Sequence, residues 1–228
     1  MKLKKSCLVL LFLAGTNSAY AVSLDYRHEY TDVDKTNKDR LLITHRFGNG
    51  FGFGLEAMWK NSGENKDIPF NDMVSNGTEL TLGYQFPVNS GFKLQPVFVM
   101  TSNSNSNGYK PGLYGSYQLT DSLTLSARYR WEYIRHVTQG VDDDRINRAD
   151  IWVAYTQGQW KYEYNYFYIG SDSRLRYNNR KWDYENSLKV QYAIDKAWAP
   201  YVGILNKSVK GDSSARQTGF RVGLQYSF

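Results

Sequence analysis

Apolar and polar residues alternate along most of the chain with a period of two. That period places successive side chains on opposite faces of a β-strand. The segment 159–169 shows it most clearly. Trp160 and every second residue up to Tyr168 are aromatic, whereas Lys161 and Glu163 occupy the other face. We therefore expect strands that are apolar on one face and polar on the other.

Counting this alternation from residue to residue predicts twelve strands with short and long connections between them. The predicted strands are 22–32, 37–47, 51–60, 76–86, 92–101, 109–119, 122–136, 146–157, 159–169, 181–193, 197–208 and 215–228. Tight turns such as Gly48-Asn49-Gly50 alternate with longer polar loops such as 60–75 and 170–180. A regular alternation of this kind indicates that consecutive strands run up and down, antiparallel to one another.

Strands of about ten residues with one apolar face fit a closed barrel in lipid, where no strand edge is left unpaired. The fold predicted is all-β: a twelve-stranded, antiparallel, up-and-down transmembrane β-barrel. The apolar rows end in Trp, Tyr and Phe, as an aromatic girdle at the bilayer interface does. The alternative is a soluble sandwich with the apolar faces in its core. The large aromatic residues and the charges in every strand disfavour it.

The first residues have the pattern of a secretory signal peptide. Three lysines precede a short apolar run at 8–14, and Ala19-Tyr20-Ala21 fits the small-x-small rule for cleavage. We expect residues 1–21 to be removed on export and residues 22–228 to form the barrel. Those lysines account for half of the formal net charge of +6, so the exported chain is less basic than the full sequence.

Composition excludes several other classes. A hydrophobic fraction of 41% with a mean hydropathy of −0.58 does not fit a bundle of membrane-spanning helices. Aromatic residues make up 16%, too many for a disordered chain. Cys7 is the only cysteine, which leaves neither a disulfide framework nor a cysteine metal site. No run rich in Lys and Arg predicts a nucleic-acid partner, and no motif predicts a cofactor.

The polar faces of the strands would line the inside of such a barrel. Twelve strands give a backbone radius of roughly 12–13 Å, which leaves a bore for a sugar chain in single file. Arginine stays charged and binds carboxylates with a rigid fork, so an inward row of arginines favours an acidic solute. The residues expected to bind substrate along the pore are Arg27, Arg40, Arg46, Lys110, Arg128, Arg130, Arg148, Lys189 and Arg221.

Two points about this lining stay open at the level of the sequence. Inward carboxylates accompany the cations, so a salt-bridge lattice that only supports the wall is an alternative to a permeation surface. The inward aromatic residues could stack against sugar rings or pack within the wall with equal ease. These residues are Tyr114, Trp152, Phe167 and Tyr201.

Some outer-membrane barrels are hydrolases, and a Ser–His or His–Asp arrangement in such an enzyme requires a suitably placed histidine. None of His28, His45 and His136 is followed two residues later by serine, the pairing used by the phospholipase barrel. Alternation points His28 and His45 towards lipid. His136 lies near Glu132 and the acidic run 142–144, which keeps an outer-membrane hydrolase as an alternative of another class. The same acidic run resembles a calcium cluster only weakly. We predict that the chain is not an enzyme and holds no metal.

Several segments resemble one known family. They are Lys110 to Tyr117, Ala127 to Tyr133, Asn179 to Asn186 with Leu188 to Tyr192 after it, and the final Phe220 to Leu224. Together they look like the oligogalacturonate-specific porins (KdgM type), whose relatives include the N-acetylneuraminate channel (NanC type). The likeness extends over residues 22–228, and the Arg-Tyr-Arg and Lys-Trp-x-x-Glu-Asn segments carry it most specifically.

The resemblance implies a monomeric twelve-stranded barrel surrounded by lipid in a Gram-negative outer membrane. It implies passive uptake of acidic oligosaccharides, most closely oligogalacturonates from pectin, guided by arginines in the lumen. Arg128 and Arg130 match the family motif directly, whereas the other inward cations follow from alternation alone. A channel for sialic acid or another acidic sugar is the alternative within this class.

Overall fold

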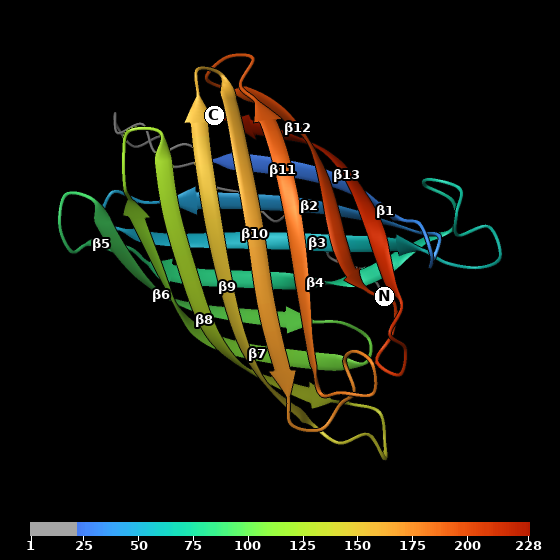
Figure 1. Ribbon diagram of the computed structural model, residues 1–228. Coiled ribbons are helices and arrows are strands. Elements are labelled where there is room, and N and C mark those ends of the chain that lie inside the picture. Colours follow the sequence, from blue (N-terminus) through green and yellow to red (C-terminus); the bar gives the residue numbers. More distant parts are fainter. Residues whose placement is uncertain (1–21) are drawn as a thin grey trace, which may run out of the picture.

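The protein folds into a closed β-barrel, shown in Figure 1 by a computed structural model that describes residues 22–228. The strands are β1 (Ser23–Thr31), β2 (Thr36–Arg46), β3 (Phe51–Asn61), β4 (Met73–Tyr84), β5 (Phe86–Pro87), β6 (Phe92–Ser102), β7 (Ser106–Gln118), β8 (Leu123–His136), β9 (Asp144–Gln157), β10 (Trp160–Ser171), β11 (Trp182–Tyr192), β12 (Trp198–Ser208) and β13 (Arg216–Ser227). The predicted signal peptide, residues 1–21, lies outside the described residues.

Antiparallel pairing closes the sheet on itself. Neighbouring strands pair in chain order, and the first and last strands pair along their whole length, from Ser23 opposite Ser227 to Thr31 opposite Gly219. Both β4 and the two-residue β5 pair with β6, so they form one barrel strand interrupted at Gln85. The barrel therefore has twelve strands, as the alternation predicted, and no free edge.

The strand bounds agree with the predicted ones to within about three residues. Two strand starts differ by that much: β7 begins at Ser106, not at residue 109, and the difference at β4 has a local cause. Strand β4 begins at Met73, not at residue 76, which shortens the preceding loop to residues 62–72. A register shift between Met58 and Trp59 lets the start of β4 keep pairing with β3. Gly77 lies beside this irregularity with a φ of 110°, a conformation that side chains disfavour. Period-two counting does not detect such a shift.

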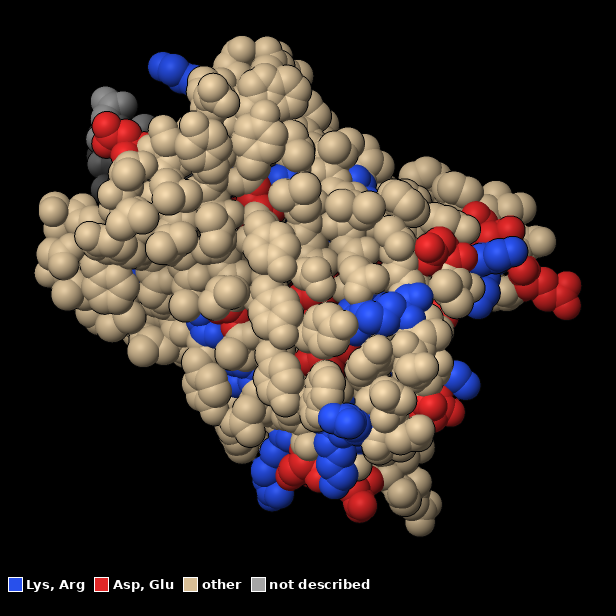
Figure 2. Space-filling model, in the orientation of Figure 1, with Lys and Arg blue, Asp and Glu red and all other residues tan. Residues whose placement is uncertain are grey.

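Burial in this fold is inverted relative to a soluble protein. Within the described residues, the buried apolar side chains are few: Val99, Ile146, Tyr201 and Leu205. Buried polar and charged side chains outnumber them, whereas large apolar side chains such as Leu55, Phe220 and Val222 are exposed. Figure 2 shows the result, an outer wall that is largely uncharged. An apolar outside around a polar inside is the arrangement that a lipid environment requires.

Aromatic pairs mark both ends of the outer wall. At the end with the short turns, the rings of Trp198 and Tyr226 lie 4.4 Å apart. At the end with the long loops, the rings of Trp131 and Tyr133 stack at 6.3 Å. Charged side chains gather around that loop end, at the right and lower margins of Figure 2. No helix in the described part of the chain is long and apolar enough to cross a membrane.

Candidate functional site

Two pairs of arginines lie directly opposite each other in the register of neighbouring strands. Arg27 on β1 faces Arg40 on β2, and Arg130 on β8 faces Arg148 on β9. Like charges in this position destabilise a sheet, so the arrangement needs compensation or a function. In the order of the twelve strands, the β1–β2 pair and the β8–β9 pair lie on opposite sides of the barrel. Positive charge therefore faces the lumen from two opposite walls.

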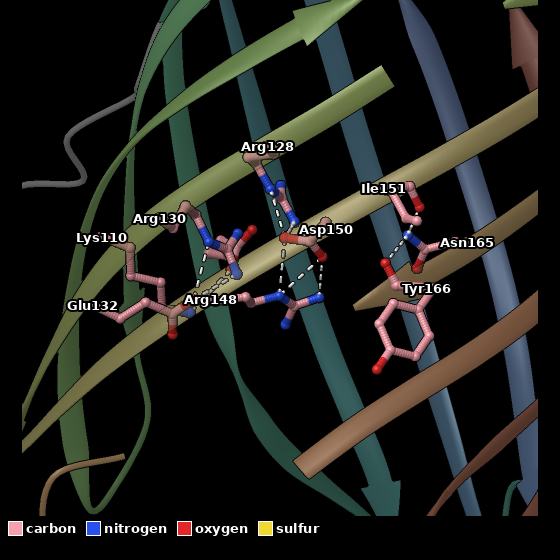
Figure 3. A network of polar contacts seen from close by, with 10 residues as sticks. Lys110, Arg128, Arg130, Glu132, Arg148, Asp150, Ile151, Asn165 and Tyr166 are labelled. Carbon is pink, nitrogen blue, oxygen red and sulfur yellow. Dashed lines mark hydrogen bonds and ion pairs between the residues drawn. The ribbon is translucent and has the colours of Figure 1, made fainter. Parts of the chain in front are cut away.

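On the β8–β9 wall, one carboxylate holds two guanidinium groups. Asp150 accepts hydrogen bonds from Arg128 Nε at 3.2 Å and from Arg148 Nη2 at 2.7 Å, and its side chain is fully buried. Figure 3 shows Arg128 and Arg148 approaching Asp150 from opposite sides. Next to them, Arg130 Nη2 lies 2.7 Å from Glu132 Oε1. Because more guanidinium groups than carboxylates meet here, this wall keeps an excess of positive charge.

On the opposite wall, carboxylates and cations form a second network. Arg40 Nη2 lies 2.5 Å from Asp25 Oδ1, and Arg40 Nη1 lies 3.4 Å from Glu56. Glu29 pairs with Arg221 at 2.7 Å and with Lys207 at 2.8 Å. These bonds fix the directions of Arg40 and Arg221, which long and flexible side chains do not maintain by themselves.

Arg27 and Arg46 differ from the other cations. Within residues 22–228, Arg27 has neither a hydrogen bond nor a salt bridge with any side chain. Arg46 donates to Gly50 O and to Gln95 Oε1, each at 2.9 Å, and has no carboxylate partner in this range. Within residues 22–228, the charges of Arg27 and Arg46 are therefore not neutralised by a carboxylate in direct contact, unlike those of the paired arginines.

Two cavities follow the lumen between these networks. One of about 240 Å³ is lined by Arg27, Arg40, Lys189, Tyr201 and Arg221, and also by Trp152. Trp152 on β9 and Arg40 on β2 belong to opposite walls in the strand order, so side chains narrow the lumen at this level.

A larger cavity of about 540 Å³ extends towards the short-turn end. Arg40, Arg46, Glu56, Glu79 and Gln95 are among its lining residues. Its wall also includes glycines and a threonine of β3 and β4, together with larger residues such as Leu42 and Phe53. The glycines leave space on this side of the lumen.

All nine predicted pore residues are brought to the lumen by the fold. Arg27, Arg40, Lys189 and Arg221 line the smaller cavity and Arg46 the larger one. Arg128, Arg130 and Arg148 belong to the network in Figure 3, and Lys110 on β7 pairs separately with Glu79 at 3.6 Å. The arrangement has features of both interpretations of the lining, a salt-bridge lattice and a charged pore surface, because most cations are paired with carboxylates and yet face the bore.

Sequence reasoning missed two contributors. Lys207 holds Glu29, and Gln95 holds Arg46. Lys207 lies two and four residues after Leu205 and Gly203 on β12, so strict alternation would have placed all three on the lumen face. No pattern signals the contact of Gln95, because it joins β6 to the end of β2, which are not neighbouring strands.

The inward aromatic rings make cation–π contacts with three of the lumen cations. Arg148 Cζ lies 3.8 Å from the centre of the Phe167 ring, and Arg128 Cζ lies 5.2 Å from that of Trp152. Lys189 Nζ lies 5.6 Å from the Tyr201 ring. Cation–π contact of this kind orients a guanidinium and keeps its polar edge free for another partner. The rings therefore pack against the charged lining, and Trp152 and Tyr201 also line the smaller cavity.

The three histidines do not assemble a hydrolytic site. His28 bonds to Asp39 on the outer wall at 2.9 Å, and the ring of His45 packs against Phe47 at 4.4 Å. At the loop end, only the backbone N–H of His136 bonds to Asp143. Hydrogen bonds from the Tyr133 hydroxyl and from that N–H lower the pKa of Asp143. The fold thus separates His136 from Glu132, which pairs with Arg130 in the lumen.

The acidic run 142–144 does not form a cation cage. Asp143 bonds to Tyr133, whereas Asp144 accepts from Ser171, Ser173 and Arg176. Among the described residues, no group of three or more His, Cys, Asp or Glu side chains is placed to hold a metal ion.

Comparison with known proteins agrees with this geometry. The model of the family described as oligogalacturonate-specific porin protein (KdgM) matches residues 16–228. The chain belongs to this porin family. It is therefore a member of a family of channel proteins and not of an enzyme family.

Relatives of the KdgM family cover nearly the whole chain. The oligogalacturonate-specific porin KdgM of Dickeya dadantii is 38% identical, with all of both chains covered. The uncharacterized protein YiiY of Salmonella typhimurium is 40% identical over 99% of this chain and 98% of its own. The solved KdgM porin has a TM-score of 0.69 at 36% identity, covering 91% of this chain and 99% of its own. A KdgM porin has also been solved in complex with disordered oligogalacturonate, at the same similarity to this chain.

Proposed function

We propose that this chain is an outer-membrane channel through which acidic oligosaccharides, and oligogalacturonates in particular, diffuse down their gradient. The observation that supports the proposal most directly is the pair of opposed arginine pairs, Arg27 with Arg40 and Arg130 with Arg148. Each pair places like charges side by side at a cost in stability, and an anionic solute in the lumen would offset that cost.

The solute would move by exchange of partners. A uronate carboxylate entering the lumen would bond to a guanidinium whose own carboxylate partner lies within 2.7 to 3.4 Å. Since each paired arginine keeps further N–H groups, binding does not require that the protein salt bridge be broken completely. Shared bonds of this kind are weak enough to release the solute, as conduction requires. No energy input or covalent step is involved.

The width of the lumen adds a second selection. Arg40 and Trp152, from opposite walls, both line a cavity of about 240 Å³. A folded protein would not pass this level, whereas an extended sugar chain would pass lengthwise. We infer that the channel admits chains in single file.

Three further properties belong to this proposal. The chain would reach the outer membrane with residues 1–21 as a cleaved signal peptide, it would be surrounded by lipid, and it would act as a monomer. The chain carries a full set of charges within one barrel, so a second copy is not needed to complete the lining. Mass measurement of the purified barrel would test the cleavage site and the oligomeric state together.

Liposome swelling tests the transport itself. Vesicles containing the purified barrel are diluted into solutions of equal osmolarity, with trigalacturonate, a neutral trisaccharide or N-acetylneuraminate as the solute. We expect the fastest swelling with trigalacturonate. Fastest swelling with N-acetylneuraminate would instead identify a sialic-acid channel, and equal rates for the acidic and neutral trisaccharides would contradict both assignments.

A further inference from the structure

A patch of polar side chains is buried on the outer wall of the barrel, where lipid contact would be expected. Asn37, Asp39 and Asn61 are 0%, 2% and 3% exposed. They alternate along β2 and β3 with lumen residues such as Arg40, so their side chains point outward. Polar groups in hydrocarbon are costly unless their hydrogen bonds are satisfied, so something must cover this patch.

The loop 62–72, between β3 and β4, supplies the cover. Asn37 Nδ2 donates to the carbonyl oxygen of Lys66 at 2.9 Å, and Asn61 Nδ2 donates to that of Ile68. Both anchors lie on the outer face of the barrel, so the loop folds back against this wall and not over the mouth of the pore. The polar patch is therefore shielded from lipid by the backbone of the loop.

His28 completes the contact between wall and loop. Its Nδ1 lies 2.9 Å from Asp39 Oδ1 and its Nε2 lies 3.1 Å from Asn37 Oδ1. Because Asn37 uses its Nδ2 for Lys66, the ring of His28 links the side-chain oxygens of Asp39 and Asn37. Asp39 Oδ1 also accepts from Tyr26 Oη at 2.6 Å. These bonds offset part of the cost of burying the polar groups, whereas Asp39 Oδ2 and Asn61 Oδ1 have no hydrogen-bond partner among the described residues.

The outward side of the same loop is apolar. Ile68 and Phe70 are 53% and 59% exposed, and the Phe70 ring lies 5.1 Å from the ring of His28, directly above the polar patch. Met73, where β4 begins, is also exposed and continues this surface onto the lipid-facing wall. The apolar surface of the loop is thus continuous with the part of the barrel that contacts lipid.

We propose that the loop 62–72 is a membrane-contact element that inserts Ile68 and Phe70 among the acyl chains of the adjacent bilayer leaflet. The network of His28, Asn37 and Asp39 fixes its position against the wall. The charged residues Glu64, Lys66 and Asp67 precede the apolar segment 68–70 and would lie at the level of the headgroups. This proposal does not depend on which solute the pore carries.

Spin labelling of the intact barrel in lipid vesicles tests the proposal. On a Cys7→Ser background the chain has no other cysteine, so Ile68→Cys and Phe70→Cys each give one labelled site. Val137→Cys, in the loop 137–143 and 61% exposed, is the matched control. We expect labels at 68 and 70 to collide more with oxygen, which partitions into acyl chains, than with a water-soluble nickel chelate, and the label at 137 to show the reverse.

Releasing the loop provides the second arm. Asn37→Ala removes the bond to Lys66, and in this background the label at 70 should become several-fold more accessible to the nickel chelate. Asn61→Ala is the second variant if the first does not fold, and heat-modifiable gel mobility reports folding. Equal nickel accessibility at 70 and 137 in the unreleased protein would overturn the proposal. Spectral broadening at 70 that grows with the protein-to-lipid ratio would also overturn it, because a second copy would then cover the loop.

Discussion

Arg27 and Arg40 lie directly opposite each other on β1 and β2, and both line the narrow part of the lumen. Asp25 and Glu56 hold Arg40, whereas Arg27 has no bonded side-chain partner within residues 22–228. The two arginines therefore have different consequences if they are replaced. Under the proposed function, Arg40 would both support the wall and contact solute, and Arg27 would have only the second role.

Replacing Arg27 should change solute binding and barrel stability in opposite directions. Arg27→Gln should weaken the block of channel current by oligogalacturonate about tenfold, because a lost charge-assisted hydrogen bond costs on the order of 1.5 kcal/mol. The barrel should become more stable by about 0.5 kcal/mol, since a like-charge cross-strand pair is removed. Current block and urea unfolding of the same preparation measure the two effects.

Arg145→Gln is the control for this variant. Arg145 lies on the outward face of β9 near the loop end and is exposed, so its replacement should leave the block unchanged. A barrel that loses stability on Arg27→Gln while keeping its block would assign Arg27 to the wall instead of to the solute.

Asp150 should be the most sensitive carboxylate in the lumen. Asp150→Asn leaves Arg128 and Arg148 without their shared partner, and removing one member of a buried ionic network costs about 3–5 kcal/mol. Unfolding followed by tryptophan fluorescence would measure the loss. The double variant with Arg148→Gln should recover part of it, whereas additive losses would show that the shared carboxylate does not couple the two arginines.

Much of this fold could be predicted because a membrane barrel has one simple rule, that residues alternate between lipid and lumen. The rule predicted the bounds of β10 to within two residues, and it assigned the nine cations to the inward face, where the structure has them. The rule did not predict the irregular register beside Met58 and Gly77. Such a shift does not change which residues in the sequence are apolar and which are polar. It also could not predict which carboxylate each arginine holds, because that depends on side-chain reach between strands.

On the outer wall, too, alternation predicts which face a residue lies on but not its contacts. Alternation placed His28 outside, as the structure does, but a buried Asp39 beside it has no signal in the pattern. The loop that bonds to the nearby Asn37 follows β3, the next strand along the chain. Contacts of this kind are invisible to a local period.

A glycine near the end of the chain makes room for a lumen residue. A Cβ at Gly223 would overlap the ring of Tyr201, whose hydroxyl donates to Asp25 at 3.0 Å. Gly223→Ala should therefore displace the ring and destabilise the barrel by about 1–3 kcal/mol, the usual cost of overpacking. Urea unfolding gives the value. Tyr201→Phe keeps the ring and loses only the hydroxyl, so it should cost less, and equal losses would contradict the steric explanation.

Arg46 should set anion preference at the short-turn end. It has no carboxylate partner within the described residues and is held by Gln95 and the Gly50 carbonyl. Arg46→Gln should lower the anion-to-cation permeability ratio, measured as the zero-current potential across a salt gradient. Gln95→Ala should lower it partly, because the charge remains but its position is lost. Lys196→Gln, in an exposed turn at the same end, should have no effect.

The central claim is that opposed arginines in a narrow lumen select acidic sugar chains. The most direct test is single-channel current in a planar bilayer, with oligogalacturonate titrated against a neutral oligosaccharide of equal length. We predict concentration-dependent block by the acidic chain at concentrations where the neutral chain has no effect, and loss of that difference when Arg27 and Arg130 are both replaced by glutamine. Equal block by both sugars in the unmodified channel would contradict the claim.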